Sequence, residues 1–342
     1  MKRKRISIAV LLAALFIFPG KGYCHHAAAG GSLGQACPII TVSATTLPKG
    51  DKYIGLYTAY TGFGAFDASE LQEAAIEGND IHNIKYLFTE SIAAAYGVTE
   101  DLTLNLNLPY VLRAHIREGS VESGISGIEN HGSSEGISDL AVLSEYRFFY
   151  DKNKGLEAAF LFGLKTPSGN TGIKDKTGAR FTTEHQPGSG SWDPQAGIAL
   201  TRHLRKFSFD TNYSYTFANK GAQDTYLGDI FNYNFSVSYC PQAEEESEAV
   251  EGSHHEENEH GDGPSWNYIL EVNGEWRGKQ KIGAEKDPNS GGNTIFFSPG
   301  IRLTTQSKWA YALSVGVPVF QNLDGKQNKS LVNIVFQLSK GF

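Results

Sequence analysis

Methionine, cysteine and long apolar stretches are nearly missing from this sequence of 342 residues. The one Met is the initiator, so the chain lacks a common filler of helical cores. Three Cys are too few for a disulfide-rich scaffold. Beyond residue 24, no apolar run is long enough to cross a bilayer as a helix. These absences argue against a helical membrane protein.

Glycine and aromatic residues are abundant instead, with 38 Gly, 16 Tyr and 20 Phe. Glycine is common in turns and aromatic residues are enriched in strands, so this composition favours an all-β protein. A mean hydropathy of −0.31 would normally indicate a soluble protein. In a transmembrane β-barrel only alternate residues face lipid, so the same value is compatible with a membrane protein.

The first 24 residues have the pattern of a secretory signal peptide. MKRKR is followed by an apolar run over residues 6–18, a Pro-Gly pair and small residues. We expect cleavage after Gly22 or Cys24, followed by a periplasmic N-terminal segment over residues 25–51. The signal carries five basic residues and no acid, so the exported chain is more acidic than the formal net charge of −7. Such a chain offers no basic surface to nucleic acid.

Several segments alternate apolar and polar residues over the roughly 9–11 positions that a tilted membrane strand needs. In residues 207–217, Phe and Tyr alternate with Ser, Asp, Asn and Thr, and residues 229–240 and 102–110 repeat the arrangement. A soluble β-sandwich usually combines an aliphatic face with a face rich in Lys and Glu. The polar face here is Asn, Ser and Thr, which is typical of a wet lumen.

Such segments predict an all-β fold, a transmembrane antiparallel β-barrel of about twelve strands within residues 52–342. The expected strands are 52–63, 85–96, 101–112, 138–150, 155–166, 192–203, 207–218, 229–240, 266–277, 293–304, 308–320 and 331–342. Tight connections (GVTED, DKNKG, LRK, QSK) alternate with long ones at 64–84, 113–137, 167–191 and 278–292. Bacterial barrels have short periplasmic turns and long extracellular loops, so both termini are expected in the periplasm. IITVSATT at 39–46 could be a further strand, but we interpret it as a periplasmic lead-in.

The last expected strand ends in an aromatic residue, Phe342. Val332, Ile334, Phe336 and Leu338 share its apolar face. A terminal aromatic resembles the signal by which outer-membrane barrels are recognised, so we expect the barrel-assembly machinery and outer-membrane lipid as partners. Lys340 departs from that pattern, because a bulky apolar residue is usual there.

Five stretches in order over residues 46–342 carry a resemblance to a known family: TLPKGDKYIGLYTAYTGF, GISDLAVLSEYRF, GLKTPSGN, SPGIRL and VGVPVFQ. They resemble the outer-membrane transporters related to the putative MetA pathway of phenol degradation. The resemblance implies a twelve-stranded barrel that passes small, often aromatic or otherwise hydrophobic solutes. None of the stretches is a catalytic signature, and each is a strand-and-turn pattern.

One connection departs from the alternation of short and long. Residues 241–263, PQAEEESEAVEGSHHEENEHGDG, stand where a short periplasmic turn is expected, and they carry nine acids and no Lys or Arg. Interleaved imidazole and carboxylate groups suit Zn, Cu, Ni or Co. The candidate ligands of a zinc or copper ion are His254, His255, His260, Glu256, Glu257 and Glu259. The same composition also predicts a disordered, solvated loop without a specific metal.

Charged residues fall on the lumen-facing positions of the expected strands. They are Asp139, Glu145, Arg147, Asp210, Glu271, Glu275, Arg277 and Arg302. Such residues form either a constriction that selects solutes electrostatically or an ion-paired network that closes a narrow barrel. On the outward face, we interpret Tyr110, Tyr239, Trp276, Trp309 and Tyr311 as part of the interfacial aromatic girdle.

Two cysteines would remain if Cys24 leaves with the signal. Cys37 precedes the first strand, and Cys240 ends a strand at the expected periplasmic rim. In an oxidising compartment we predict a disulfide between them. Two unpaired thiols are the alternative, because the sequence does not show whether their Cα atoms come within about 7 Å.

A rival class of function is an outer-membrane lipid hydrolase. His131 and Ser133 offer a base and a nucleophile, with Glu129, Asn130 and Glu135 nearby to orient the imidazole. The segment ENHGSSEG is expected in a Gly/Ser-rich loop, which would not hold a catalytic hydrogen bond rigidly. We therefore expect no enzymatic activity.

The sequence thus predicts an outer-membrane channel for small solutes, aromatic or hydrophobic compounds among them. A metal-handling barrel that uses the His-rich insert is the alternative. A purely structural or adhesive barrel is a third class that the sequence leaves open.

Overall fold

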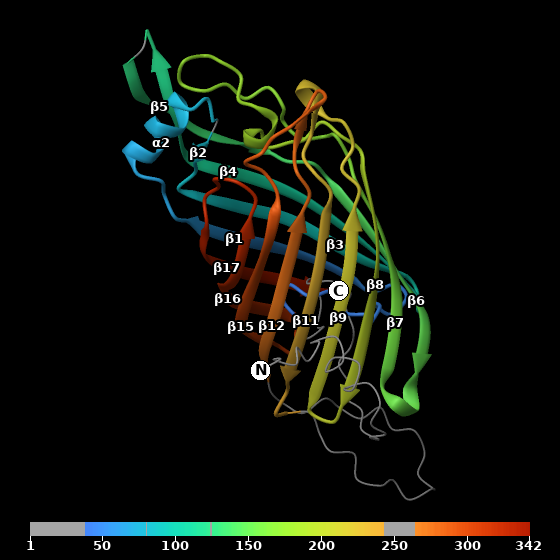
Figure 1. Ribbon diagram of the computed structural model, residues 1–342. Coiled ribbons are helices and arrows are strands. Elements are labelled where there is room, and N and C mark those ends of the chain that lie inside the picture. Colours follow the sequence, from blue (N-terminus) through green and yellow to red (C-terminus); the bar gives the residue numbers. More distant parts are fainter. Residues whose placement is uncertain (1–37, 80, 124, 243–263) are drawn as a thin grey trace, which may run out of the picture.

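The computed structural model describes residues 38–79, 81–123, 125–242 and 264–342. Twelve long antiparallel strands close into a barrel (Figure 1). They are β1 (Lys52–Phe63), β3 (Tyr86–Thr99), β4 (Leu102–Glu122), β6 (Ala141–Asp151), β7 (Leu156–Lys165), β8 (Asp193–Leu204), β9 (Phe207–Thr216), β11 (Ile230–Tyr239), β12 (Ser265–Arg277), β15 (Gly292–Thr304), β16 (Trp309–Leu323) and β17 (Ser330–Gly341). Each pairs with its neighbours along the chain, and the β1–β17 pair completes the ring.

This architecture confirms the predicted barrel, and each expected strand range overlaps one of the twelve strands. In β16, Trp309, Tyr311 and Leu313 are exposed, whereas Ala310 and Ala312 are buried. Large apolar side chains that point outward can contact lipid, and small or polar ones turn into the lumen. Four residues of the predicted girdle, Tyr110, Trp276, Trp309 and Tyr311, are exposed, whereas Tyr239 is half-buried.

The two ends of the barrel differ in their connections, and we call them the turn end and the loop end. At the turn end β3 joins β4, β8 joins β9, and the short helix η1 (Lys152–Lys154) joins β6 to β7. The C-terminus lies there too, because Phe342 exchanges backbone hydrogen bonds of 2.9 and 3.4 Å with Lys52.

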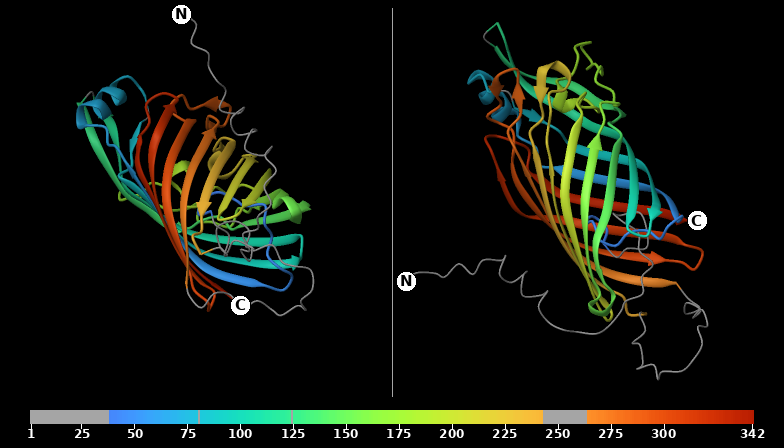
Figure 2. Two further views of the ribbon diagram at one scale, coloured as in Figure 1. Left: turned by 90° about the horizontal axis from the view of Figure 1, so that it is seen from below. Right: turned by 90° about the vertical axis from the view of Figure 1, so that its right-hand side faces the viewer.

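The loop end carries the shorter elements (Figure 2). They are α2 (Ala68–Ile76), β2 (His82–Asn83), β5 (Ile125–Ile137), η2 (Thr183–His185), η3 (Ala222–Asp224), β10 (Thr225–Tyr226), β13 (Lys281–Ile282) and β14 (Glu285–Lys286). Within the described ranges, no helix is both long and apolar enough to cross a membrane.

The prediction of a loop over residues 113–137 is wrong for most of that range. β4 continues to Glu122, and β5 returns beside it as a hairpin that pairs Tyr110 with Ile137 and Glu122 with Ile125. This hairpin is rich in Gly and Ser, so its sequence lacks the apolar alternation by which the other strands are recognised. Backbone hydrogen bonds hold its two strands together. Helix α2 packs on it at Gly119, where a Cβ atom would come within 2.0 Å of the Leu71 carbonyl oxygen.

The segment 38–48 crosses the lumen near the turn end, and we call it the plug. Eight of its eleven residues, including Ile39, Ala44 and Leu47, are buried, and none of the segment is charged. We expected residues 39–46 to lead in from the periplasm. In the structure they lie inside the barrel, because their backbone donors find acceptors on the inward side chains of several strands, described below.

The pairing of β4 with β6 is a short seam. It covers only six residue pairs, from Leu102↔Tyr146 to Asn107↔Ala141. Beyond it β4 changes partner and pairs with β5 from Tyr110 onward. The Ser138 amide still donates to the Pro109 carbonyl oxygen at 2.7 Å, but residues 138–140 belong to no strand. Few backbone pairs therefore join neighbouring wall strands at this point.

Candidate functional site

One carboxylate on the barrel wall anchors the start of the plug. The fully buried Glu271 side chain on β12 accepts hydrogen bonds from the backbone amides of Ile39, Ile40 and Thr41 at 3.3, 3.1 and 2.9 Å. Buried backbone donors must be paired, and three donors converging on one charged acceptor form a strong anchor. Glu271 thus supplies the acceptor that the buried amides at the start of the plug require.

Other wall strands hold the rest of the plug. Asn212 on β9 accepts from the Val42 amide at 2.9 Å, Thr201 on β8 from the Ala44 amide at 2.8 Å, and Thr103 on β4 from the Leu47 amide at 2.8 Å. On the far side, Arg302 donates to the Pro38 carbonyl oxygen at 2.7 Å, and Gln337 donates to the Ile39 carbonyl oxygen at 2.8 Å. The plug is therefore bonded to the wall around the lumen.

Apolar contacts add to these hydrogen bonds. Ile39 packs with Ile269, Ala312 and Val335, while Ala44 and Leu47 join two further apolar clusters on other parts of the wall. Glycine lets the chain approach the wall closely at Gly97, where a Cβ atom would stand 2.0 Å from the Pro48 carbonyl oxygen. Together these contacts close the turn-end half of the lumen.

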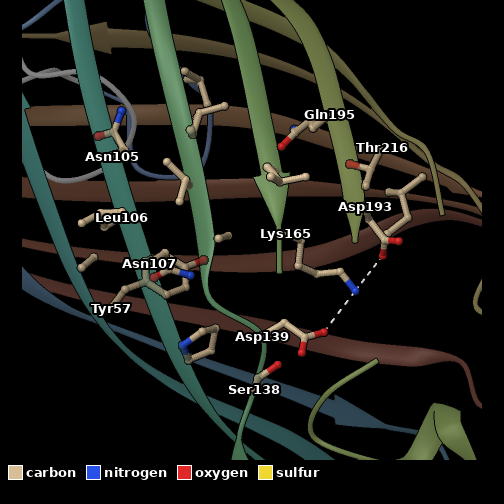
Figure 3. Close-up of a pocket in the computed structure, with 18 of the residues that line it drawn as sticks. Tyr57, Asn105, Leu106, Asn107, Ser138, Asp139, Lys165, Asp193, Gln195 and Thr216 are labelled. Atoms are coloured by element: carbon tan, nitrogen blue, oxygen red, sulfur yellow. Dashed lines mark hydrogen bonds and ion pairs between the residues drawn. The ribbon is translucent and has the colours of Figure 1, made fainter. Parts of the chain in front are cut away.

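A cavity of about 610 Å³ lies on the loop-end side of the plug (Figure 3). Ile39, Ile40 and Val42 of the plug contribute to its floor, and Asn105 and Leu143 line its wall. A concave site of a few hundred Å³ with apolar walls and few polar groups is typical of small-molecule binding.

An ion-paired group lies at the rim of this cavity. Lys165 on β7 contacts the carboxylates of Asp139 at 3.2 Å and Asp193 at 2.7 Å (Figure 3). Asp139 also accepts from the amide and hydroxyl of Ser189 at 2.8 and 2.6 Å, which ties the loop 167–191 to the rim. The positive charge of Lys165 partly neutralises the two carboxylates. The apolar residues of the floor then make up the larger part of the cavity surface.

The cavity lining also includes residues of the seam and of the strand beside it. Its lining includes Leu106, Val142 and Leu164, and Leu106 and Leu164 are outward side chains that are 45% and 39% exposed. The cavity therefore borders both the lumen and the face that contacts lipid.

The remaining predicted lumen residues occupy three settings. Arg147 pairs with Glu157 and Asp101, each at 2.9 Å, near the turn end. Asp210 accepts from Thr201 at 2.7 Å and, like Glu145, is buried. Glu275 and Arg277 pair with each other at 3.1 Å at the loop end, where both are nearly half exposed. The structure does not bring all eight together into one ring.

Several predicted sites lie outside the described residues. These are the signal peptide, Cys37, and the insert ligands His254, His255, His260, Glu256, Glu257 and Glu259. Cys240 is buried just beyond the end of β11 at the turn end. The predicted disulfide and the predicted insert metal site therefore stay predictions.

The candidate hydrolase pair has separate contacts. The segment that carries it is strand β5, and the expectation of a loop there is wrong. His131 Nδ1 contacts Asp175 at 2.8 Å, and its Nε2 lies 3.3 Å from Glu118. Ser133 Oγ accepts from the His115 amide at 3.2 Å. The contacts described for the imidazole and for the hydroxyl do not join them into a nucleophile–base pair.

Sequence reasoning missed a polar cluster at the loop end. His82 and His131 both contact the Glu118 carboxylate, at 3.0 and 3.3 Å, and His82 also faces the ring of His185. Burial and the neighbouring His82 lower the pKa of His185 well below its usual value, so its imidazole is neutral at pH 7. The only signal in the sequence is that three of the four long connections, 64–84, 113–137 and 167–191, carry histidine.

In the same cluster, Asp175 holds a charge strongly. Desolvation would raise the pKa of its carboxyl group, but hydrogen bonds from Thr177 and His131 outweigh this and lower the pKa to about 2. Asp175 is therefore ionised at neutral pH and organises the tip of the loop 167–191.

The chain is similar to one protein family and to several solved outer-membrane proteins. A family model described as the putative MetA-pathway of phenol degradation matches residues 86–265. An outer membrane channel from Pseudomonas putida F1 has a similar structure, with a TM-score of 0.53, 14% identity, and 87% of this chain and 98% of that chain covered. The CymD monoaromatic hydrocarbon channel gives a TM-score of 0.39, with 11% identity and coverage of 87% and 89%.

LpxR from Salmonella typhimurium gives a TM-score of 0.41, with 11% identity and coverage of 84% and 99%. No curated protein matches the chain. The likeness to the Pseudomonas putida channel shows that the fold is that of an outer-membrane β-barrel. Because the family model spans more than half of the chain, the protein belongs to the family of the putative MetA-pathway of phenol degradation.

Proposed function

We propose that the protein is an outer-membrane channel for small apolar solutes, monoaromatic compounds among them, without an enzymatic step. The observation that carries this proposal is the cavity of about 610 Å³ that lies between the plug and the extracellular loops. Its floor is aliphatic, and three of its charged groups, Lys165, Asp139 and Asp193, pair with one another at the rim. Burial of apolar surface is the main force that would hold a solute there.

The orientation follows from the two ends of the barrel. Bacterial barrels place short turns in the periplasm and long loops outside the cell, so the plug lies toward the periplasm and the cavity opens toward the loops. The family description names phenol degradation, and the Pseudomonas putida structure is an outer membrane channel. Both support a channel, and the apolar floor supports an apolar cargo.

The proposed exit is the seam between β4 and β6. The plug blocks a straight path to the periplasm, whereas the cavity borders the lipid-facing residues Leu106 and Leu164. An apolar solute gains by moving from the cavity into lipid, but a hydrophilic one does not. The seam therefore selects for solutes that dissolve in the membrane.

A cavity-filling substitution tests this function. Leu143→Trp places a large ring on the wall beside Val42, and we expect it to reduce accumulation of labelled toluene by cells that express the protein at least several-fold. Tyr146→Trp, on the same strand but pointing outward and 48% exposed, is the matched control and should accumulate toluene as the wild type does. Equal uptake by both variants and the wild type would contradict the proposed cavity.

A further inference from the structure

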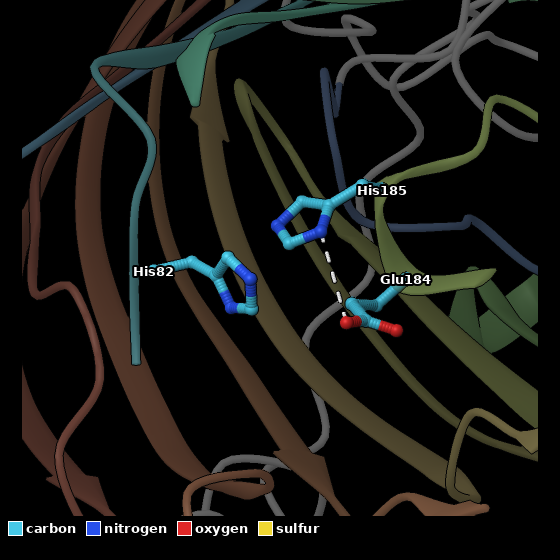
Figure 4. Close-up of side chains that lie close together, drawn as sticks. All are labelled: His82, Glu184 and His185. Carbon is cyan, nitrogen blue, oxygen red and sulfur yellow. Dashed lines mark ion pairs between the residues drawn. The ribbon is translucent and has the colours of Figure 1, made fainter. Parts of the chain in front are cut away.

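We propose that the loop end binds a divalent transition metal ion, of the zinc class, between His82, Glu184 and His185. Ligand atoms from these three residues lie within 4.8 Å of one another (Figure 4). The two imidazole rings meet edge to face, with centroids 4.5 Å apart and an interplanar angle of 64°. Two histidines and one carboxylate form a ligand set that zinc uses in proteins, with the fourth position left to water.

The spacing suits an ion after a small adjustment. Zinc bonds of about 2.1 Å hold tetrahedral ligand atoms about 3.4 Å apart. The three side chains therefore need to close by at most about 1.4 Å, which rotamer adjustment supplies. Glu184 is 29% exposed, and the His82 side chain is 17% exposed, so an ion can enter from the loop surface.

Neighbouring groups already orient the ligands. The Thr182 hydroxyl lies 3.0 Å from Nδ1 of His185 and donates to Glu184. Gln280 donates to the other oxygen of the same carboxylate at 3.1 Å, and Glu118 contacts Nε2 of His82 at 3.0 Å. Such outer contacts fix ring orientation and raise the affinity of metal sites.

The site would join two extracellular segments that are far apart in the chain. His82 lies on β2, which pairs with β4, and Glu184 and His185 lie on η2 in the loop 167–191. The same loop reaches the cavity rim through Ser189 and Asp139. A bound ion would therefore fasten this loop beside the entrance. Metal binding and bridging at this site do not depend on which solute the channel transports.

The test is a titration of the refolded full-length protein with Zn²⁺ and, for its absorption spectrum, with Co²⁺. The His254→Ala/His255→Ala/His260→Ala background removes imidazoles of the insert from the measurement. We expect one ion per chain, visible d–d bands of tetrahedral Co²⁺, and no comparable binding of Mg²⁺. His82→Gln and His185→Gln should each weaken Zn²⁺ binding at least tenfold and abolish the Co²⁺ bands.

His115→Ala is the matched control, because His115 lies on β4 at the same end but is exposed and outside the cluster. It should bind Zn²⁺ as the background does, and heat-modifiable migration of every variant shows that the barrel has formed. Zn²⁺ should also slow tryptic cleavage at the exposed Lys176 and Arg180 of the bridged loop. If the two Gln variants bind Zn²⁺ as tightly as the background, the cluster is a metal-free polar network and the proposal is wrong.

Discussion

The two halves of this barrel are closed in different ways. In the turn-end half, a segment without secondary structure lies across the lumen, and side chains of the wall satisfy its backbone donors. In the loop-end half, extended strands and loops surround a cavity and meet through histidines and carboxylates. The turn-end half depends on wall side chains that bond to the plug backbone, and the loop-end half depends on contacts between histidines and carboxylates.

This difference indicates that the halves do different work. A plug bonded to the wall at several separate places resists opening, because all of its anchors must be released together. A loop cluster held by a few ionisable groups can respond to pH and to ions. The predictions below separate the two halves by disturbing one at a time.

The largest effect is expected from Glu271→Ala. The change leaves the buried amides of Ile39, Ile40 and Thr41 without their acceptor, and each unpaired donor costs about 1–3 kcal/mol. The plug should detach at its start, and the single-channel conductance in planar bilayers should rise several-fold. Glu275→Gln is the matched control, because this carboxylate lies on the same strand but pairs with Arg277 at the loop end. A conductance unchanged by Glu271→Ala would show that the plug does not close the lumen.

A smaller effect on the same half is expected from Gly97→Ala. The added Cβ atom would come within 2.0 Å of the Pro48 carbonyl oxygen, so the end of the plug must shift. We expect a lower temperature for the heat-modifiable transition and a modest rise in conductance. Gly172→Ala provides the comparison, because nothing lies within 4 Å of the Cβ position there. Equal transition temperatures for both variants would mean that this close approach does not matter.

The smallest effect concerns the loop-end half and its pH dependence. The pKa of Asp175 is depressed to about 2 in the folded chain, so its stabilisation is present above about pH 4 and is lost as the pH falls through about 2. Asp175→Asn should make the loop 167–191 more sensitive to pepsin at pH 4, and the difference from wild type should vanish near pH 2. Conductance should not change. A difference that persists at pH 2 would assign the effect to shape rather than charge.

Alternation allowed the barrel strands to be predicted, because a face that contacts lipid must be apolar at every second residue. It did not reveal β5, whose Gly- and Ser-rich hairpin is held by backbone bonds to β4. It also did not place the plug. IITVSATT has the composition of a strand, and a local pattern does not show that its amides bind Glu271, more than two hundred residues away.

The candidate site was less predictable than the fold. Asp139 was singled out as a charged lumen residue, but its partner Lys165 was not, because the pairing depends on where β6 and β7 end. His82 and His185 are separated by a long stretch of sequence, and only the packing of the loops brings their rings together. Spacing along the chain contains no sign of such a contact.

In the proposed mechanism the solute leaves through the seam between β4 and β6 while the plug stays in place. Val42→Cys with Asn212→Cys, in a background where Cys37 and Cys240 are replaced by Ser, is designed to lock the plug to β9, where the Val42 amide donates to Asn212 at 2.9 Å. Thiol titration under oxidising conditions first establishes that the disulfide has formed. Labelled toluene uptake by cells is then measured before and after reduction of this disulfide. The account predicts the same uptake in both states. Uptake that is abolished by the disulfide and restored by reduction would show instead that the solute passes through the lumen by displacing the plug.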